Sequence, residues 1–170
     1  MQLGRLGFAG LWGLAGVLLL LGQAIYKLTP VALELRYLEL GPLELAVLAG
    51  WVVMSAYSEG YRGFHRAFSP RVVARAQHLA AHPRPLFVAI APLYCLGLVH
   101  ATRKRLTVSW ILTIAIIIVV IAVRQLAQPW RGIIDAGVVI GLGIGVASIL
   151  YFIALALAGR VMPVSPDVPG

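Results

Sequence analysis

Residues 107–123 read TVSWILTIAIIIVVIAV, seventeen residues in a row without a charged side chain. A hydrocarbon core strongly disfavours unpaired charge, so an apolar run of about this length is typical of a membrane-spanning helix. Three further runs contain no Asp, Glu, Lys or Arg, and a fourth contains only Glu44 near its start: residues 6–26, 86–101, 137–159 and 43–58. The chain is therefore expected to be an all-α, polytopic integral membrane protein.

Composition supports the same class of protein. The chain is 61% hydrophobic and only 12% charged, whereas a soluble domain carries about 25% charged residues. Five helices and their connections use nearly all of the 170 residues, so we expect a single transmembrane domain over residues 1–162 and a disordered tail over 163–170. The net charge of +8 flanks the apolar runs and accompanies no nucleic-acid motif, which favours anionic lipids over nucleic acid as the partner.

The runs and their flanking Pro and Gly residues predict five spans, at about residues 6–28, 43–58, 86–101, 107–126 and 132–159. The first run is too long for the apolar region of a signal peptide, so we expect an uncleaved helix. Thr29-Pro30 resembles a helix start and Gly41-Pro42 a helix stop, which together predict a short helix lying in the membrane interface.

The span at residues 86–101 is the weakest of the five. As a helix it reaches only about 24 Å, and Pro92 and Gly97 interrupt it. The alternative is four spans plus a re-entrant segment at 86–101, which places ten basic residues on one face and four on the other, instead of eight and six. A re-entrant backbone needs shielding by protein, which a small chain provides poorly. We therefore expect five crossings.

A basic amphipathic helix is expected at about residues 70–82, inside the long polar connection. Arg71, Arg75, His78 and His82 follow one another at i, i+4, i+7 and i+11, which places them on one helical stripe opposite an apolar face. We expect this helix to lie on the bilayer and to bind anionic lipid headgroups, with Arg62 and Arg66 extending its charge. The alternative is a solvated helix that only connects two spans.

Three glycines form overlapping GxxxG motifs in the last span: Gly137, Gly141 and Gly145. Glycines at this spacing let two helices approach until their backbones touch, which drives helix association in lipid. The pattern favours packing within the chain over a dimer interface, and leaves open a homo-oligomer or another membrane-protein partner.

Arg131 and Asp135 stand four residues apart at the start of the same span. We interpret them first as a helix-stabilising ion pair, because this spacing and a negative charge near a helix N-terminus are both favourable. The alternative is a polar gate at the mouth of the helix.

A metal or haem site is a further hypothesis. His78 and His82 have ligand spacing on a helix, and His65, His100 and Cys95 could complete a site. His100 shares a face with the others only if residues 86–101 are re-entrant. No carboxylate accompanies the histidines and no pair of histidines lies inside two spans, so no metal and no cofactor are expected, and no catalytic set of residues can be assembled.

The sequence thus predicts an accessory or interaction protein that acts through helix packing and contact with anionic lipids. The first alternative is a subunit of a small oligomeric transporter or channel, and the second is a haem- or metal-binding membrane protein. The Gly- and Arg-rich, Lys-poor composition favours a bacterial inner membrane.

Overall fold

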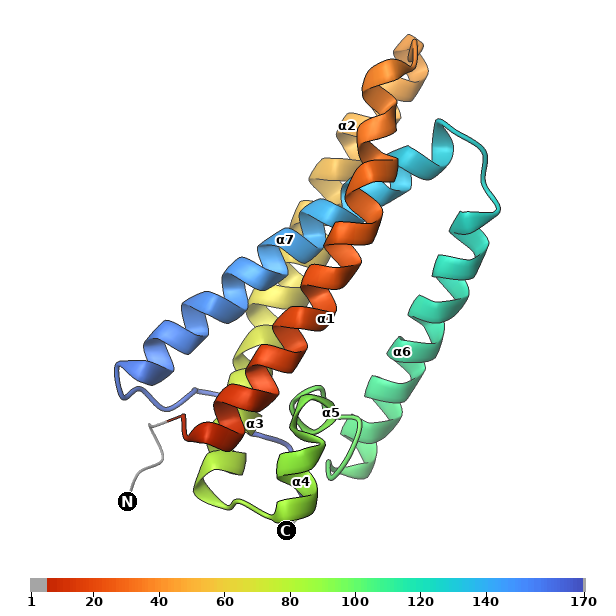
Figure 1. Cartoon of the computed structure of the whole chain (residues 1–170). Helices are drawn as coiled ribbons and strands as arrows, with labels where there is room; N and C mark the ends of the chain where they lie inside the picture. The colour runs from red at the N-terminus through yellow and green to blue at the C-terminus, as the bar shows by residue number, and fades with distance from the viewer. Residues whose placement is uncertain (1–5, 170) are drawn as a thin grey trace.

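The computed structural model describes residues 6–169, which form helices joined by irregular connections and contain no strand (Figure 1). The first five residues of the expected domain and Gly170 of the expected tail lie outside the described range. The elements, in chain order, are α1 (Phe8–Leu33), η1 (Glu34–Tyr37), α2 (Pro42–Ser55), η2 (Ala56–Phe68), α3 (Ser69–Ala81), α4 (Pro85–Ala89), α5 (Ala91–Cys95), α6 (Arg103–Arg124) and α7 (Trp130–Leu157).

Three of the described helices are long and apolar enough to cross a membrane: Phe8–Tyr37, Arg103–Val123 and Trp130–Leu157. They cover most of the expected spans at residues 6–28, 107–126 and 132–159. The prediction of an all-helical protein is confirmed, and these helices support its association with a membrane.

The prediction that a new helix starts at Thr29-Pro30 is wrong. α1 continues through this pair to Leu33 and then tightens into the short 3-10 helix η1. Thr29 does not cap a helix, because its hydroxyl donates to the carbonyl oxygen of Ile25 at 2.7 Å, one turn back. Pro30 has no backbone N–H, so it costs α1 a single hydrogen bond. The helix continues past it to Leu33.

A single long helix replaces the separate second span and amphipathic helix that the sequence predicts. α2, η2 and α3 follow one another from Pro42 to Ala81 without a break, and we call them together the long helix. η2 is a π-helix, with wider turns than an α-helix. Ser69 is bonded within it, because its N–H donates to the carbonyl oxygen of Phe64 five residues earlier. The Ser69-Pro70 pair therefore lies inside a continuous helix.

Residues 86–101 do not form the single helix that the sequence predicts. The segment contains two five-residue helices, α4 and α5, and the chain leaves α5 through Gly97, whose φ is +76°. Glycine adopts this left-handed conformation without steric cost, which ends the helix there. The segment begins where α3 ends and delivers the chain to the start of α6, at the same end of the bundle (Figure 1).

α1, the long helix and α7 pack side by side and form most of the core, whereas α6 stands apart with most of its side chains exposed (Figure 1). The core between them contains small and branched apolar side chains, among them Leu14, Val17, Val72, Val73 and Ile149. α5 also packs against α1 and α3. The three packed helices therefore meet α4, α5 and the C-terminal tail at one end.

The GxxxG face of α7 is covered by the long helix of the same chain. A methyl carbon placed at Gly137 would lie 2.8 Å from the hydroxyl oxygen of Ser55, and one at Gly141 would lie 2.9 Å from Glu59 Oε2. At Gly145 it would lie 2.6 Å from the ring of Phe64. The glycines allow the close approach that the spacing implies, and their contacts lie within one chain.

Candidate functional site

One end of the bundle collects most of the basic and histidine side chains. α1 begins there, α3 and α7 end there, and α4, α5 and the start of α6 lie between them (Figure 1). We call it the basic end. Its charged and titratable side chains include Arg71, Arg75, Arg84, Arg103, Lys104, Arg105, Arg160, Asp167, His78, His82 and His100.

Arg75 is the buried centre of this end. Its side chain is 1% exposed, although it belongs to the stripe that the sequence assigns to the bilayer surface. Its guanidinium donates to the carbonyl oxygens of Tyr94 (2.5 Å), Pro166 (2.6 Å), Val99 (2.9 Å) and His100 (3.0 Å). Buried charge needs such compensation. Arg75 is thus withdrawn from lipid headgroups, which corrects the predicted role of this residue.

The C-terminal tail lies against α3, although the sequence predicts that residues 163–170 are disordered. The side-chain amide of Gln77 donates to the carbonyl oxygen of Arg160 at 2.8 Å, and its oxygen accepts from the N–H of Met162 at 3.2 Å. Further along, the N–H of Thr102 donates to the backbone carbonyl oxygen of Asp167 at 2.8 Å. The tail therefore joins α3 to the start of α6.

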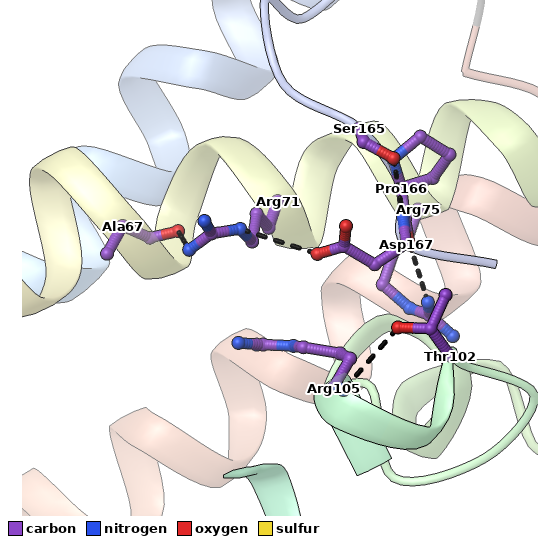
Figure 2. A network of polar contacts seen from close by, with 8 residues as sticks. All are labelled: Ala67, Arg71, Arg75, Thr102, Arg105, Ser165, Pro166 and Asp167. Atoms are coloured by element: carbon purple, nitrogen blue, oxygen red, sulfur yellow. Dashed lines mark hydrogen bonds and ion pairs between the residues drawn. The ribbon is translucent and has the colours of Figure 1, made fainter.

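Figure 2 shows the polar network at this junction. The carboxylate of Asp167 lies 3.5 Å from Nε of Arg71, while Nη1 of Arg71 donates to the carbonyl oxygen of Ala67 at 3.1 Å. Both partners of the ion pair are about one-third exposed. Arg105 extends beneath the pair, so two guanidinium groups accompany one carboxylate (Figure 2). The network carries an excess of positive charge.

A cavity of about 150 Å³ opens beside Arg75. Its lining consists of His78, His82, Arg84, Phe87, Tyr94, His100 and Pro169, and among the described residues no carboxylate lines it. We call it the histidine pocket. Nδ1 of His78 shares a hydrogen bond of 2.9 Å with the hydroxyl of Tyr94, and the rings of Phe87 and His100 stack with centroids 4.5 Å apart. These contacts hold two of its histidines in place.

Burial and the positive charges around the pocket change the pKa values of its histidines. Burial lowers the pKa of His78, and the nearby His82, Arg75, His100 and Arg84 lower it further. Burial also lowers the pKa of His100, with Arg84 and Arg75 acting in the same direction. Both imidazoles therefore favour the neutral form until a negative charge enters the pocket and stabilises the protonated form.

The five side chains suggested for a metal site do not meet. His65 lies on η2 against Ser148, and Cys95 is buried beneath Gly13 of α1. His78, His82 and His100 share the pocket, but among the described residues no group of three or more His, Cys, Asp or Glu side chains has the arrangement that holds a metal ion. The pocket offers imidazole, guanidinium and phenol groups, which donate hydrogen bonds to an anion.

The remaining predicted residues lie away from the pocket. Arg62 and Arg66 are exposed on η2, and Arg66 lies over the ring of Tyr61. Arg131 and Asp135 lie at the opposite end of the bundle, with Nε and Oδ2 3.9 Å apart and Asp135 4% exposed.

Sequence reasoning missed Tyr94 and Phe87, because both belong to the segment that it treats as one apolar helix. The only indication of them in the sequence is that an aromatic side chain stands near each of the two breaks in that segment. Comparison with protein-family models, curated proteins and solved structures finds no match for this chain.

Proposed function

We propose that this protein is an accessory membrane protein of four crossings and one re-entrant segment, which binds a phosphate-bearing anion in the histidine pocket. In this proposal α1, the long helix, α6 and α7 cross the bilayer, and residues 85–101 enter it from the basic end and return. The basic end faces the cytoplasm of a bacterial inner membrane. α6, with its exposed apolar surface, is the helix available to a membrane-protein partner.

Charge distribution supports this topology. Of the basic residues described, seven belong to the basic end and four to the opposite end, and the remaining two, Arg62 and Arg66, lie on η2 between the ends. Short loops rich in Arg and Lys stay on the cytoplasmic side. The larger number of basic residues at the basic end supports the re-entrant alternative over five crossings.

Packing removes the main objection to a re-entrant segment, which is its exposed backbone. A methyl carbon at Gly13 of α1 would lie 2.6 Å from Sγ of Cys95, and one at Gly16 would overlap the ring of Pro92. The glycines of α1 thus let α5 approach the helix closely. Tyr94 and Cys95 are each 1% exposed, and Arg75 donates to the carbonyl oxygens of Tyr94, Val99 and His100. Irregular backbone is tolerated in a membrane when protein covers it in this way.

The observation that carries the binding proposal is the set of hydrogen-bond donors that line the pocket. Three imidazoles and the guanidinium of Arg84 converge on one cavity that no described carboxylate lines. Arginine donates paired hydrogen bonds to phosphate, and histidine adds charge as it protonates. The carboxylate of Asp167, which belongs to the basic end, is paired with Arg71. The charge therefore favours a phosphate group, carried either by a lipid headgroup or by a soluble metabolite.

Binding of a phosphorylated lipid to the full-length protein in nanodiscs tests the proposal. We expect phosphatidic acid in a phosphatidylcholine disc to be retained by the wild type, and the double variant His82→Ala, Arg84→Ala to weaken its binding at least tenfold. Both side chains are exposed, so the fold should persist. The control is Arg36→Ala, which removes an exposed arginine at the opposite end.

Soluble glycerol phosphate distinguishes the two sources of the phosphate group. Binding of both ligands identifies the phosphate alone as the recognised group, and binding of the lipid alone identifies a headgroup with its acyl chains. Equal affinity of wild type and double variant for both ligands would overturn the proposal.

A further inference from the structure

Polar side chains also follow the interface between the long helix and α7, inside the bundle. We call this series the polar row. Its members are Ser55, Glu59 and His65 of the long helix and Ser148 of α7. The proposed anion pocket uses none of them.

Glu59 lies deep along α7. Its carboxylate is next to Gly141, because a methyl carbon at that glycine would lie 2.9 Å from Oε2. Gly141 follows the start of α7 by roughly 17 Å and precedes its end by roughly 24 Å at 1.5 Å per residue. The surrounding residues 137–159 contain no charged side chain. If α7 crosses the bilayer, Glu59 lies within the hydrocarbon region.

The carboxylate of Glu59 has no ion-pair partner among the described residues, and the cation nearest to it along the chain is the exposed Arg62, three residues further on η2. Its carboxylate takes part in neither of the ion pairs found among the described residues, which join Arg71 to Asp167 and Arg131 to Asp135. α7 faces it with Gly141, and the neighbouring Gly60 faces the side chain of Ile144. An ionisable group in such surroundings is costly, and within membranes it marks paths for ions or protons.

Ser55 is a buried member of the polar row without a hydrogen-bonding partner. Its hydroxyl oxygen makes no hydrogen bond in the described structure, and the residue is 0% exposed. It faces Gly137 of α7, where a methyl carbon would lie 2.8 Å from this oxygen. Buried polar atoms are almost always bonded to protein or to ordered water. The hydroxyl of Ser55 therefore points to a water molecule between the two helices.

His65 continues the row toward the basic end. Its Nδ1 shares a hydrogen bond of 3.2 Å with the hydroxyl of Ser148, seven residues beyond Gly141 on α7. Its ring packs against those of Tyr61, Tyr151 and Phe152. Glu59 and His65 both belong to η2, and π-helical turns occur often at functional sites.

We propose that the polar row carries protons across the membrane, with Glu59 and His65 binding the proton in turn. Water beside Ser55 delivers a proton to the carboxylate of Glu59, which becomes a neutral carboxylic acid. The acid returns the proton to water on its other side, and that water protonates the imidazole of His65. His65 then releases the proton toward the basic end, so that each group returns to its starting state.

Proton flux into proteoliposomes tests this proposal on the purified full-length protein. A potassium gradient with valinomycin sets the membrane potential, and a pH-sensitive dye inside the vesicles reports the flux. We expect flux above that of protein-free vesicles for the wild type. Glu59→Gln should reduce it at least tenfold, because the amide cannot take up a proton. His65→Phe, which keeps an aromatic ring among the same neighbours, should also reduce it.

The matched control is Glu39→Gln, which neutralises an exposed glutamate at the opposite end of the bundle. It should conduct as the wild type does. Wild-type vesicles that conduct no better than protein-free ones would overturn the proposal, as would a Glu59→Gln variant with unchanged flux. A flux of sodium without a change of internal pH would overturn it in favour of a metal cation path.

Binding of phosphatidic acid separates this proposal from the proposed function. Glu59→Gln should bind the lipid as the wild type does, whereas His82→Ala, Arg84→Ala should lose binding and still conduct protons. Either proposal can thus fail while the other holds.

Discussion

The guanidinium of Arg75 lies against the ring of Tyr94, with Cζ 4.4 Å from the ring centroid, and its Nε donates to the carbonyl oxygen of the same residue. A cation over an aromatic face is stabilised by the quadrupole of the ring. The contact attaches α5 to α3, and the hydroxyl of Tyr94 in turn holds His78 of the pocket. Arg75 therefore supports the pocket without lining it.

Replacing Arg75 should destabilise the protein strongly. Arg75→Met removes the donor from four carbonyl oxygens and leaves them unpaired, which should cost about 3 kcal/mol or more. Thermal unfolding in detergent, followed by circular dichroism, measures the loss. The control Arg84→Met removes an exposed arginine, for which we expect a change within about 0.5 kcal/mol. Similar melting temperatures for the two variants would contradict the central role of Arg75.

The glycines of α7 allow a matched pair of substitutions on one helix. Gly137→Ala places a methyl carbon where it overlaps Nε1 of Trp51, so we expect a loss of about 2 kcal/mol. Gly143→Ala meets nothing within 4 Å and should stabilise the helix by up to about 1 kcal/mol. Melting temperatures of both variants test the packing of α7 on the long helix. A stabilising Gly137→Ala would show that this face is open.

Stability should depend on pH through His78. Its pKa is lowered from the ordinary value of 6.5 in the folded protein, so between the two values the unfolded chain binds more protons. Stability is therefore complete above pH 6.5 and falls as the pH drops through this window. Melting temperature measured against pH should fall less steeply for His78→Gln than for the wild type. Identical slopes would show that His78 does not contribute.

The same histidines should make anion binding stronger in acid. A bound phosphate stabilises protonated His78 and His100, so binding takes up protons and the affinity should rise as the pH falls below 6.5. The double variant His78→Gln, His100→Gln should bind with a weaker dependence on pH. Titration of glycerol phosphate at several pH values provides the measurement, and an affinity that is independent of pH in the wild type would contradict the role of these histidines.

The sequence predicts those parts of the fold that depend on uninterrupted apolar runs. The runs ending at Tyr26 and Val123 lie in α1 and α6, because each is long and uncharged. The conformation of residues 86–101 depends on Gly97 and on how closely α5 packs against the glycines of α1. Such a fit joins residues far apart in the chain, and no local pattern reports it.

The site is less predictable than the fold for the same reason. Regular spacing does place His78 and His82 together, and their rings stack with centroids 4.9 Å apart. The spacing gives Arg75 the same polar stripe, but the carbonyl groups that bury it come from residues 94–100 and from Pro166 of the tail. A polar stripe identifies which residues share a face and leaves open what covers that face.

Thiol labelling tests the proposed topology directly. In a Cys95→Ser background, single cysteines at the exposed positions Ala81, Arg103 and Gln125 report which side of the membrane each occupies. We expect an impermeant maleimide to label positions 81 and 103 from the same side and position 125 from the other. Positions 81 and 103 on opposite sides would establish that residues 85–101 cross the bilayer, and would contradict the re-entrant segment.

The surroundings of Glu59 should make it reactive toward a hydrophobic carbodiimide. Such reagents partition into the bilayer and react there with carboxylic acids, and Glu59 packs against the uncharged part of α7 at Gly141. Glu39 and Glu44 lie near the opposite end of the bundle, away from the uncharged part of α7. We therefore expect mass spectrometry to find the adduct on the peptide that contains Glu59, more slowly at high external pH, and to find none after Glu59→Gln. Loss of proton flux in parallel with labelling would link this carboxyl group to transport. Labelling of Glu39 or Glu44 in preference to Glu59 would show that the carboxylate of Glu59 is charged or shielded, and a proton path through it would then be ruled out.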